Sequence, residues 1–97
     1  MYSSRMINTV IISKHAKNDL KKVPSYVALK LQAWINNTEV QGLEEVRKVL
    51  GWHDEPLYGK RKGQRSIRLS KSYRAIYVTK KTHIEFVSIE EVHKHAY

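Results

Sequence analysis

A change in the spacing of apolar residues near Pro56 divides this 97-residue chain into two parts with different secondary structure. The residues before it include a stripe at the helical spacing i, i+4, i+7, i+8, namely Val27, Leu31, Trp34 and Ile35. After it, Ile67 and Leu69 alternate with polar residues, as in a half-buried strand. A chain with this division must pack helices against a sheet.

The pattern predicts three helices and four strands. The expected helices are Lys14–Lys22, a second from Pro24 to about Asn37 and a shorter third, Leu43–Leu50, and the expected strands are Ile7–Ile12, the segment around Ile67 and Leu69, Tyr73–Thr79 and His83–Ile89. This order predicts one α+β domain over residues 1–97, with two or three N-terminal helices on one face of a small, mostly antiparallel sheet.

The composition excludes several kinds of site. With no cysteine, the chain has no disulfide scaffold, zinc-thiolate site or thiol nucleophile, and it suits a reducing compartment. No apolar run approaches the ~20 residues of a membrane span, and the N-terminus lacks an apolar signal core. We therefore expect a cytoplasmic protein with no membrane partner.

The positive charge is concentrated in the second part of the chain. The net charge is +9, and residues 60–97 hold 10 Lys and Arg against 3 Asp and Glu. Such a surface attracts nucleic acid, although a basic face can also serve solubility alone. Nucleic acid is the favoured interpretation, because arginine predominates in the centre of the basic run and aromatic residues flank it. The expected RNA-binding residues are Lys60, Arg61, Lys62, Arg65 and Lys71.

Two arginines on neighbouring strands are expected to bind one phosphate. Side chains alternate along a strand, so Arg68 points away from the face of Ile67 and Leu69. Arg74 begins the next strand after a tight turn, and two planar guanidiniums can bind a phosphate through paired hydrogen bonds. The alternative is a structural role in which Arg74 pairs with Glu85 or Glu90.

The C-terminus holds residues that can transfer protons, namely His93, His95 and Tyr97. The alternative is a polar tail with no role. A zinc site that combines these histidines with His53 and either Asp54 or Glu91 is less favoured, because no second pair of ligands is fixed on rigid structure. We expect no metal and no cofactor.

Cations, imidazoles and a phenol suit cleavage of RNA by its own 2′-OH. A base removes the hydroxyl proton, the oxygen attacks the adjacent phosphate, and an acid protonates the departing 5′-oxygen. Arginine and lysine stabilise the charge that grows on the phosphate. DNA lacks the 2′-OH and is not cut in this way.

The second half of the chain resembles the RelE/HigB group of toxins from type II toxin–antitoxin systems. The similar segments are Leu57–Leu69, Ser72–Tyr77 and Val92–Tyr97, and the clear resemblance covers about residues 50–97. The family pattern implies a RelE-like fold and a metal-independent mRNA endoribonuclease. The resemblance also implies two partners: mRNA in the decoding region of the small ribosomal subunit, and a cognate antitoxin that silences the toxin.

The resemblance assigns roles to some of the predicted site residues. Arg74 matches the arginine of the family's Tyr-Arg step, which stabilises phosphate, and Arg68 falls where relatives place Lys or Arg. His93, His95 and Tyr97 fall in the tail that supplies acid or base, with His93 favoured. His53 resembles a histidine that precedes the Leu-x-Gly segment in some HigB proteins, although two extra residues intervene here.

Three other functions stay open. A ParE-type toxin of the same fold inhibits DNA gyrase and would not need the C-terminal histidines. A non-catalytic RNA- or ribosome-binding module would explain the charge but not the tail. An inactive relative of the toxins is the third alternative.

Overall fold

A five-stranded sheet with helices on one face forms the structure, a computed structural model that describes residues 7–92. Residues 1–6 and 93–97 lie outside the described residues. The elements follow in the order β1 (Val10–Ile12), α1 (Lys14–Leu20), α2 (Ser25–Gln41), α3 (Leu43–Val46), the 3-10 helix η1 (Leu50–Trp52), β2 (Glu55–Pro56), the 3-10 helix η2 (Gly59–Arg61), β3 (Gln64–Arg68), β4 (Tyr73–Thr79) and β5 (Ile84–Glu91).

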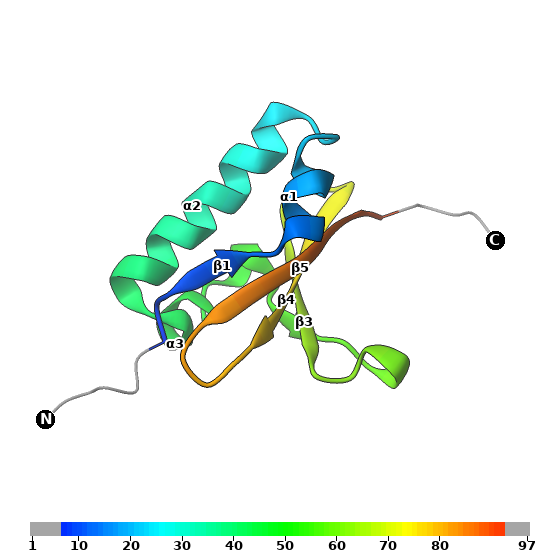
Figure 1. The fold of residues 1–97 in the computed structure, drawn as a ribbon. Helices are drawn as coiled ribbons and strands as arrows, with labels where there is room; N and C mark the ends of the chain where they lie inside the picture. Colours follow the sequence, from blue (N-terminus) through cyan, green and yellow to red (C-terminus); the bar gives the residue numbers. More distant parts are fainter. Residues whose placement is uncertain (1–6, 93–97) are drawn as a thin grey trace, which may run out of the picture.

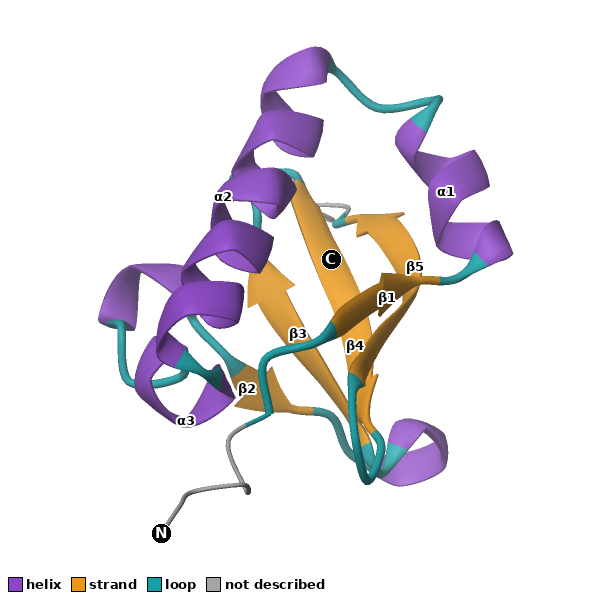
Figure 2. Cartoon of the chain, turned by 60° about the vertical axis from the view of Figure 1, so that its left-hand side comes forward, coloured by secondary structure: helices purple, strands orange, loops and turns teal. Residues whose placement is uncertain are grey.

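The sheet has the strand order β1-β5-β4-β3-β2, in which β1 runs parallel to β5 and the other neighbours are antiparallel. Figures 1 and 2 show α1 and α2 on the same side of the sheet. The predicted α+β class, with helices on one face of a mostly antiparallel sheet, is confirmed. None of the helices in residues 7–92 is long and apolar enough to cross a membrane.

The core lies between α2 and the covered face of the sheet, which we call the helix face. Its centre is an aromatic cluster of Trp34, Tyr77 and Phe86, with ring centroids 5.2–5.6 Å apart. All three side chains are fully buried, as are Ile67 and Ala75 on the neighbouring strands. This burial of large apolar side chains is the main stabilising contribution to a domain of this size.

The other side of the sheet, which we call the open face, carries polar and charged residues. Arg68, Arg74 and Glu90 lie directly opposite one another on β3, β4 and β5, so their side chains share this face. A bulge in β5 makes this possible, because Ile76 pairs with Ser88 while the next residue of β4 pairs with Phe86. The extra residue, Val87, lets Phe86 enter the core while Ser88 and Glu90 reach the open face.

Candidate functional site

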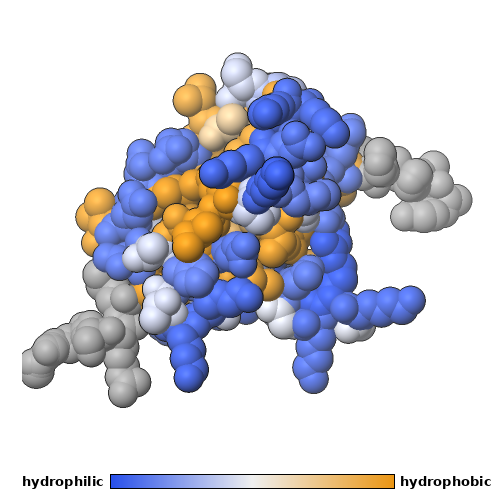
Figure 3. Space-filling model, in the orientation of Figure 1, coloured by the Kyte–Doolittle hydropathy of each residue, from blue (hydrophilic) through white to orange (hydrophobic). Residues whose placement is uncertain are grey.

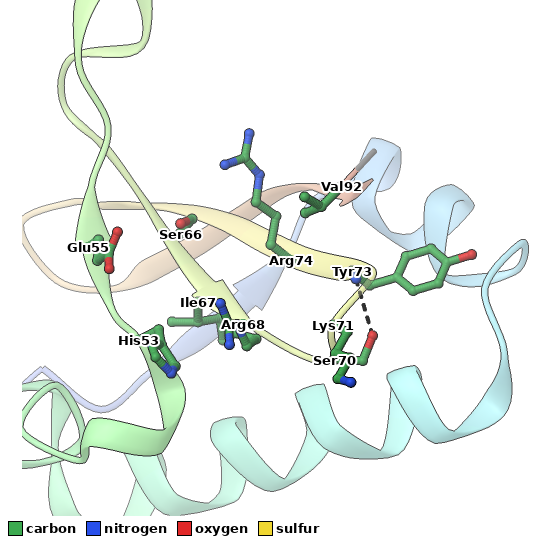
Figure 4. Close-up of a pocket in the computed structure, with 10 residues that line it drawn as sticks. All are labelled: His53, Glu55, Ser66, Ile67, Arg68, Ser70, Lys71, Tyr73, Arg74 and Val92. Atoms are coloured by element: carbon green, nitrogen blue, oxygen red, sulfur yellow. Dashed lines mark hydrogen bonds between the residues drawn. The ribbon is translucent and has the colours of Figure 1, made fainter. Parts of the chain in front are cut away.

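A cleft of about 180 Å³ opens on the sheet near the turn between β3 and β4. Figure 4 shows Arg74 on β4, Arg68 on β3, and His53 and Glu55 on the side of β2. The cleft is lined by His53, Glu55, Ser66, Ile67, Arg68, Ser70, Lys71, Tyr73, Arg74 and Val92. Residues far apart in the sequence therefore converge on one hollow that is rich in cations.

The turn between β3 and β4 is held in place by its own hydrogen bonds. The hydroxyl of Ser70 accepts bonds from the backbone N–H groups of Ser72 and Tyr73, each at 3.1 Å. The Val92 N–H donates to the Ser72 carbonyl at 2.6 Å. This local bonding replaces a sheet ladder at the turn and fixes the backbone that carries Lys71.

The predicted placement of the two central arginines is confirmed. Arg68 and Arg74 are register partners on antiparallel strands, and both line the cleft. Arg68 is exposed, whereas Arg74 is partly buried. Their role in binding phosphate is not tested by this placement and stays a prediction.

Glu90 holds two arginines together on the open face. It accepts two hydrogen bonds from Arg61, one at 3.0 Å from Nη1 and a shorter one from Nη2, and a third at 3.3 Å from Nη2 of Arg74. Ser88 donates a fourth at 3.0 Å. The bond from Arg61 is the largest cause of a Glu90 pKa of about 2, well below the usual value for glutamate. The pairing of Arg74 with Glu90 is one that the sequence left open.

Arg61 reaches across the sheet to make this contact. Its Nε donates to Gln64 on β3 at 3.2 Å, and its other nitrogens donate to Glu90 on β5. Because β4 lies between these two strands, the guanidinium spans β4 on the open face. Arg61, a predicted RNA-binding residue, is thus placed beside Arg74 by a shared carboxylate.

The other predicted RNA-binding residues are divided between three places. Lys71 lines the cleft, while Lys60 and Lys62 are exposed in and after η2, beyond the residues that line it. Arg65 shares the helix face with Ile67, because the two are separated by two positions in β3. The Nε of Arg65 donates to Asp54 at 2.6 Å, so its guanidinium is engaged away from the cleft.

The predicted proton-transfer residues His93, His95 and Tyr97 lie outside the described residues. Val92, which precedes His93 in the sequence, lines the cleft. Two of the histidines in the zinc alternative also fall outside the described part. Within residues 7–92, no three His, Asp or Glu side chains gather in a way that would hold a metal ion.

Two cleft residues, His53 and Glu55, were not among the predicted site residues. Both are exposed and line the cleft on the side of β2. The sequence signal for His53 was a similarity to HigB proteins, weakened by two intervening residues, and Glu55 had no signal. The cleft therefore offers an imidazole and a carboxylate beside three cations, a set that can bind a phosphate and exchange protons near it.

Comparisons with known proteins identify the fold through solved structures and not through the sequence. The sequence matches no family model. It matches none of the curated proteins either. Among solved structures it resembles YafQ from E. coli, with a TM-score of 0.70, 17% identity, and coverage of 87% of this chain and 92% of YafQ.

Two further structures give the same result. The YoeB/ParE toxin from Agrobacterium tumefaciens matches with a TM-score of 0.63 and 17% identity over 88% of this chain and 99% of that one. A chain of the E. coli DinJ–YafQ toxin–antitoxin complex matches with a TM-score of 0.68 and 18% identity, over 88% and 93% of the two chains. At identities this low, these structural matches show the fold alone. This chain therefore has the RelE/ParE-type fold of toxins from toxin–antitoxin systems, as its sequence resemblance implied.

Proposed function

We propose that this protein is the toxin of a type II toxin–antitoxin system and acts as a metal-independent mRNA endoribonuclease. The observation that supports this most is the convergence of Arg68, Lys71 and Arg74 with two titratable side chains in one cleft, on a fold of known toxins. The three cations bind the scissile phosphate and stabilise the charge that grows on it. The RNA supplies the nucleophile through its 2′-OH.

A histidine is the proposed proton-transfer residue. His53 is the imidazole that lines the cleft among the described residues, with Glu55 beside it. His93, favoured from the sequence, follows directly after the cleft residue Val92, and His95 and Tyr97 belong to the same proposed set. Imidazole suits both steps, because its ordinary pKa lies near neutrality.

The proposed partners follow from charge and from related complexes. A solved match is a toxin–antitoxin complex from Mycobacterium tuberculosis, and another is the DinJ–YafQ complex. We propose that a cognate antitoxin covers the cationic cleft of this chain with an acidic or amphipathic segment. The proposed substrate is mRNA in the decoding region of the small ribosomal subunit, in the cytoplasm. Lys60 and Lys62 extend the phosphate-binding surface beyond the cleft. Arg61 and Arg65, expected from the sequence to bind RNA, are left out of it because Glu90 and Asp54 engage their guanidiniums.

The test is induced expression in a bacterial host, with mapping of the 5′ ends of cellular mRNA. Arg74→Ala should reduce cleavage by at least about 100-fold, on the scale of losing one transition-state donor. Lys80→Ala is the matched control, because it removes a cation from the far end of β4. Growth arrest with new ends inside reading frames, lost in Arg74→Ala but kept in Lys80→Ala, supports the proposal.

Each other outcome points elsewhere. Growth arrest with intact mRNA would favour a gyrase inhibitor of the same fold. Binding to RNA without arrest or cleavage would favour a non-catalytic module or an inactive relative. Cleavage of free RNA by the purified protein should persist in the presence of EDTA, and its loss there would contradict the metal-independent mechanism.

A further inference from the structure

The backbone at His53 adopts a conformation that a non-glycine residue rarely occupies. Its φ is 48° and its ψ is 50°, in the left-handed region. Among residues 7–92, no other residue except glycine has a positive φ. Such a conformation costs free energy and persists only where surrounding contacts impose it. Backbone bonds hold the segment at its two ends. Between them, His53 and Glu55 are exposed while the side chain of Asp54 is buried, so the side-chain restraint on these residues comes from Asp54.

Asp54 is tied to the core by two side chains. Its own side chain is 0% exposed, and it accepts hydrogen bonds at 2.6 Å from Nε of Arg65 and at 2.6 Å from the hydroxyl of Tyr77. Arg65 also donates to the Asp54 carbonyl at 3.4 Å. A carboxylate this buried needs such partners, because an uncompensated charge in the interior is strongly unfavourable.

The anchor is rigid because Tyr77 belongs to the aromatic cluster. Its ring lies 5.3 Å from that of Trp34 and 5.6 Å from that of Phe86, and its hydroxyl points to Asp54. The position of the Asp54 backbone is therefore set by the packing of α2 against the sheet. None of the three anchoring side chains lines the cleft, whereas the two neighbours of Asp54 in the sequence do.

We propose that Asp54, Arg65 and Tyr77 are positioning residues that hold the backbone of residues 53–55, so that His53 and Glu55 project into the cleft. This inference deepens the proposed function and rests on it for the catalytic consequence. The structural consequence, a restrained segment beside the cleft, stands independently of any reaction. A merely stabilising role would be served equally well by apolar side chains of similar volume, which cost no desolvation.

Tyr77→Phe tests the proposal most cleanly, because it removes one hydroxyl and keeps the ring in its aromatic cluster. The catalytic rate constant for RNA cleavage should fall roughly tenfold with KM within about twofold, since the cations that bind substrate are untouched and only the reacting groups lose their alignment. Asp54→Asn, which weakens both bonds, should lower the rate further. If Asp54→Asn does not fold, Tyr77→Phe still decides the question.

The matched control is Ile84→Val, a buried change at the opposite end of the sheet. At a similar loss of melting temperature it should leave the catalytic rate constant unchanged. An equal loss of rate in Ile84→Val and Tyr77→Phe would overturn the positioning role, because general destabilisation would then explain both.

A second readout separates this inference from the proposed function. The amides of His53 and Leu57 bond to the Leu50 and Gln64 carbonyls on either side of the segment. Their hydrogen exchange should accelerate at least roughly tenfold in Tyr77→Phe, while amides of β4 and β5 exchange as in the wild type. A wild-type protein without cleavage activity would overturn the proposed function alone, whereas unchanged exchange at these two amides would overturn the anchor whatever the activity.

Discussion

Glu90 lets two guanidiniums lie together on the open face. It accepts two bonds from Arg61 but a single bond of 3.3 Å from Arg74, and Nε of Arg74 is buried with no hydrogen-bond partner among residues 7–92. Arg74 therefore has unused hydrogen-bonding capacity, whereas all three guanidinium nitrogens of Arg61 already donate, Nε to Gln64 and the other two to Glu90. A phosphate in the cleft would satisfy donors of Arg74 that Glu90 leaves unsatisfied.

The depressed pKa of Glu90 predicts a specific dependence of stability on pH. Because the folded-state pKa of about 2 lies below the ordinary value, the stabilisation is fully present above about pH 4.5 and is lost as the pH falls toward 2. Urea unfolding should show wild type more stable than Glu90→Gln by about 1–3 kcal/mol at pH 7, allowing for partial exposure. The difference should shrink toward zero by pH 2. A difference that does not vary with pH would show that charge at Glu90 is irrelevant to folding.

Two arginines of the basic segment, Arg65 on β3 and Arg74 on β4, should differ sharply in their effect on stability. Arg65 pairs with a fully buried Asp54, so Arg65→Ala leaves a buried carboxylate without its cation and should cost about 2–4 kcal/mol. Arg74 makes one long bond to a partly exposed Glu90, so Arg74→Ala should cost less than about 1 kcal/mol. Urea unfolding at pH 7 measures both, and equal losses would contradict the assignment of Arg65 to structure and Arg74 to the cleft.

At the scale of elements, the sequence predicted the helices and strands that are long enough to show an apolar period of their own. The strand Tyr73–Thr79 and the start of α1 at Lys14 agree with the structure, and α2 continues four residues past its expected end at Asn37. The strand β2 was not predicted, because two residues carry no period and are defined only by pairing with β3. The predicted third helix, Leu43–Leu50, is wrong in extent: α3 ends at Val46, and Leu50–Trp52 forms a separate 3-10 helix.

The candidate site could likewise be predicted only where a local pattern in the sequence places the residue. The alternation of side chains along a strand correctly placed Arg68 and Arg74 on one face. The same rule puts Arg65 on the other face with Ile67, although Arg65 was expected to bind RNA with the rest of the basic run. His53 could not be placed, because its position depends on a left-handed backbone and on a contact between Asp54 and Tyr77, 23 residues apart. Neither feature leaves a local pattern in the sequence.

The turn that carries Arg61 depends on a glycine at its end. Gly63 has φ +95°, which an L side chain rarely adopts, whereas Gly51 in η1 has no positive φ and open space around it. Gly63→Ala should lower the free energy of unfolding by about 1 kcal/mol, and Gly51→Ala should leave it unchanged or slightly raise it. Thermal or urea unfolding compares the two. Equal effects would contradict a strained turn between η2 and β3.

At the scale of the whole molecule, charge is distributed unevenly over the surface. On the side shown in Figure 3, an apolar area lies over β1 and the adjacent α2, surrounded by hydrophilic side chains, and Ile11 of β1 is 45% exposed. Of the net charge of +9, residues 60–97 contribute +7. Six described cations of that region form the surface offered to a polyanion: Arg68, Lys71 and Arg74 in the cleft, Arg61 on the open face, and Lys60 and Lys62 in and after η2. The other three lie elsewhere, because Arg65 is bonded to Asp54 on the helix face and Lys80 and Lys81 are in the turn between β4 and β5.

This distribution predicts how RNA affinity responds to salt. Each phosphate neutralised on a single strand contributes about −0.7 to the slope of log K against log salt concentration, because bound counterions are released. Contacts from Arg68, Lys71 and Arg74 alone give a slope of about −2, and adding Lys60 and Lys62 gives about −3.5.

The lysines around η2 can be tested separately from the cleft. In titrations of single-stranded RNA between 50 and 200 mM salt, Lys60→Ala/Lys62→Ala should reduce the magnitude of the slope by about 1.4, and Lys71→Ala by about 0.7. Lys14→Ala/Lys17→Ala, on α1 at the helix side of the sheet (Figure 1), removes the same charge as the first variant and should leave the slope unchanged. Equal reductions in the two double variants would mean that net charge alone governs binding. A reduction confined to Lys60→Ala/Lys62→Ala would extend the RNA path from the cleft along β3 to η2, because these lysines then contact phosphates that the cleft cannot reach.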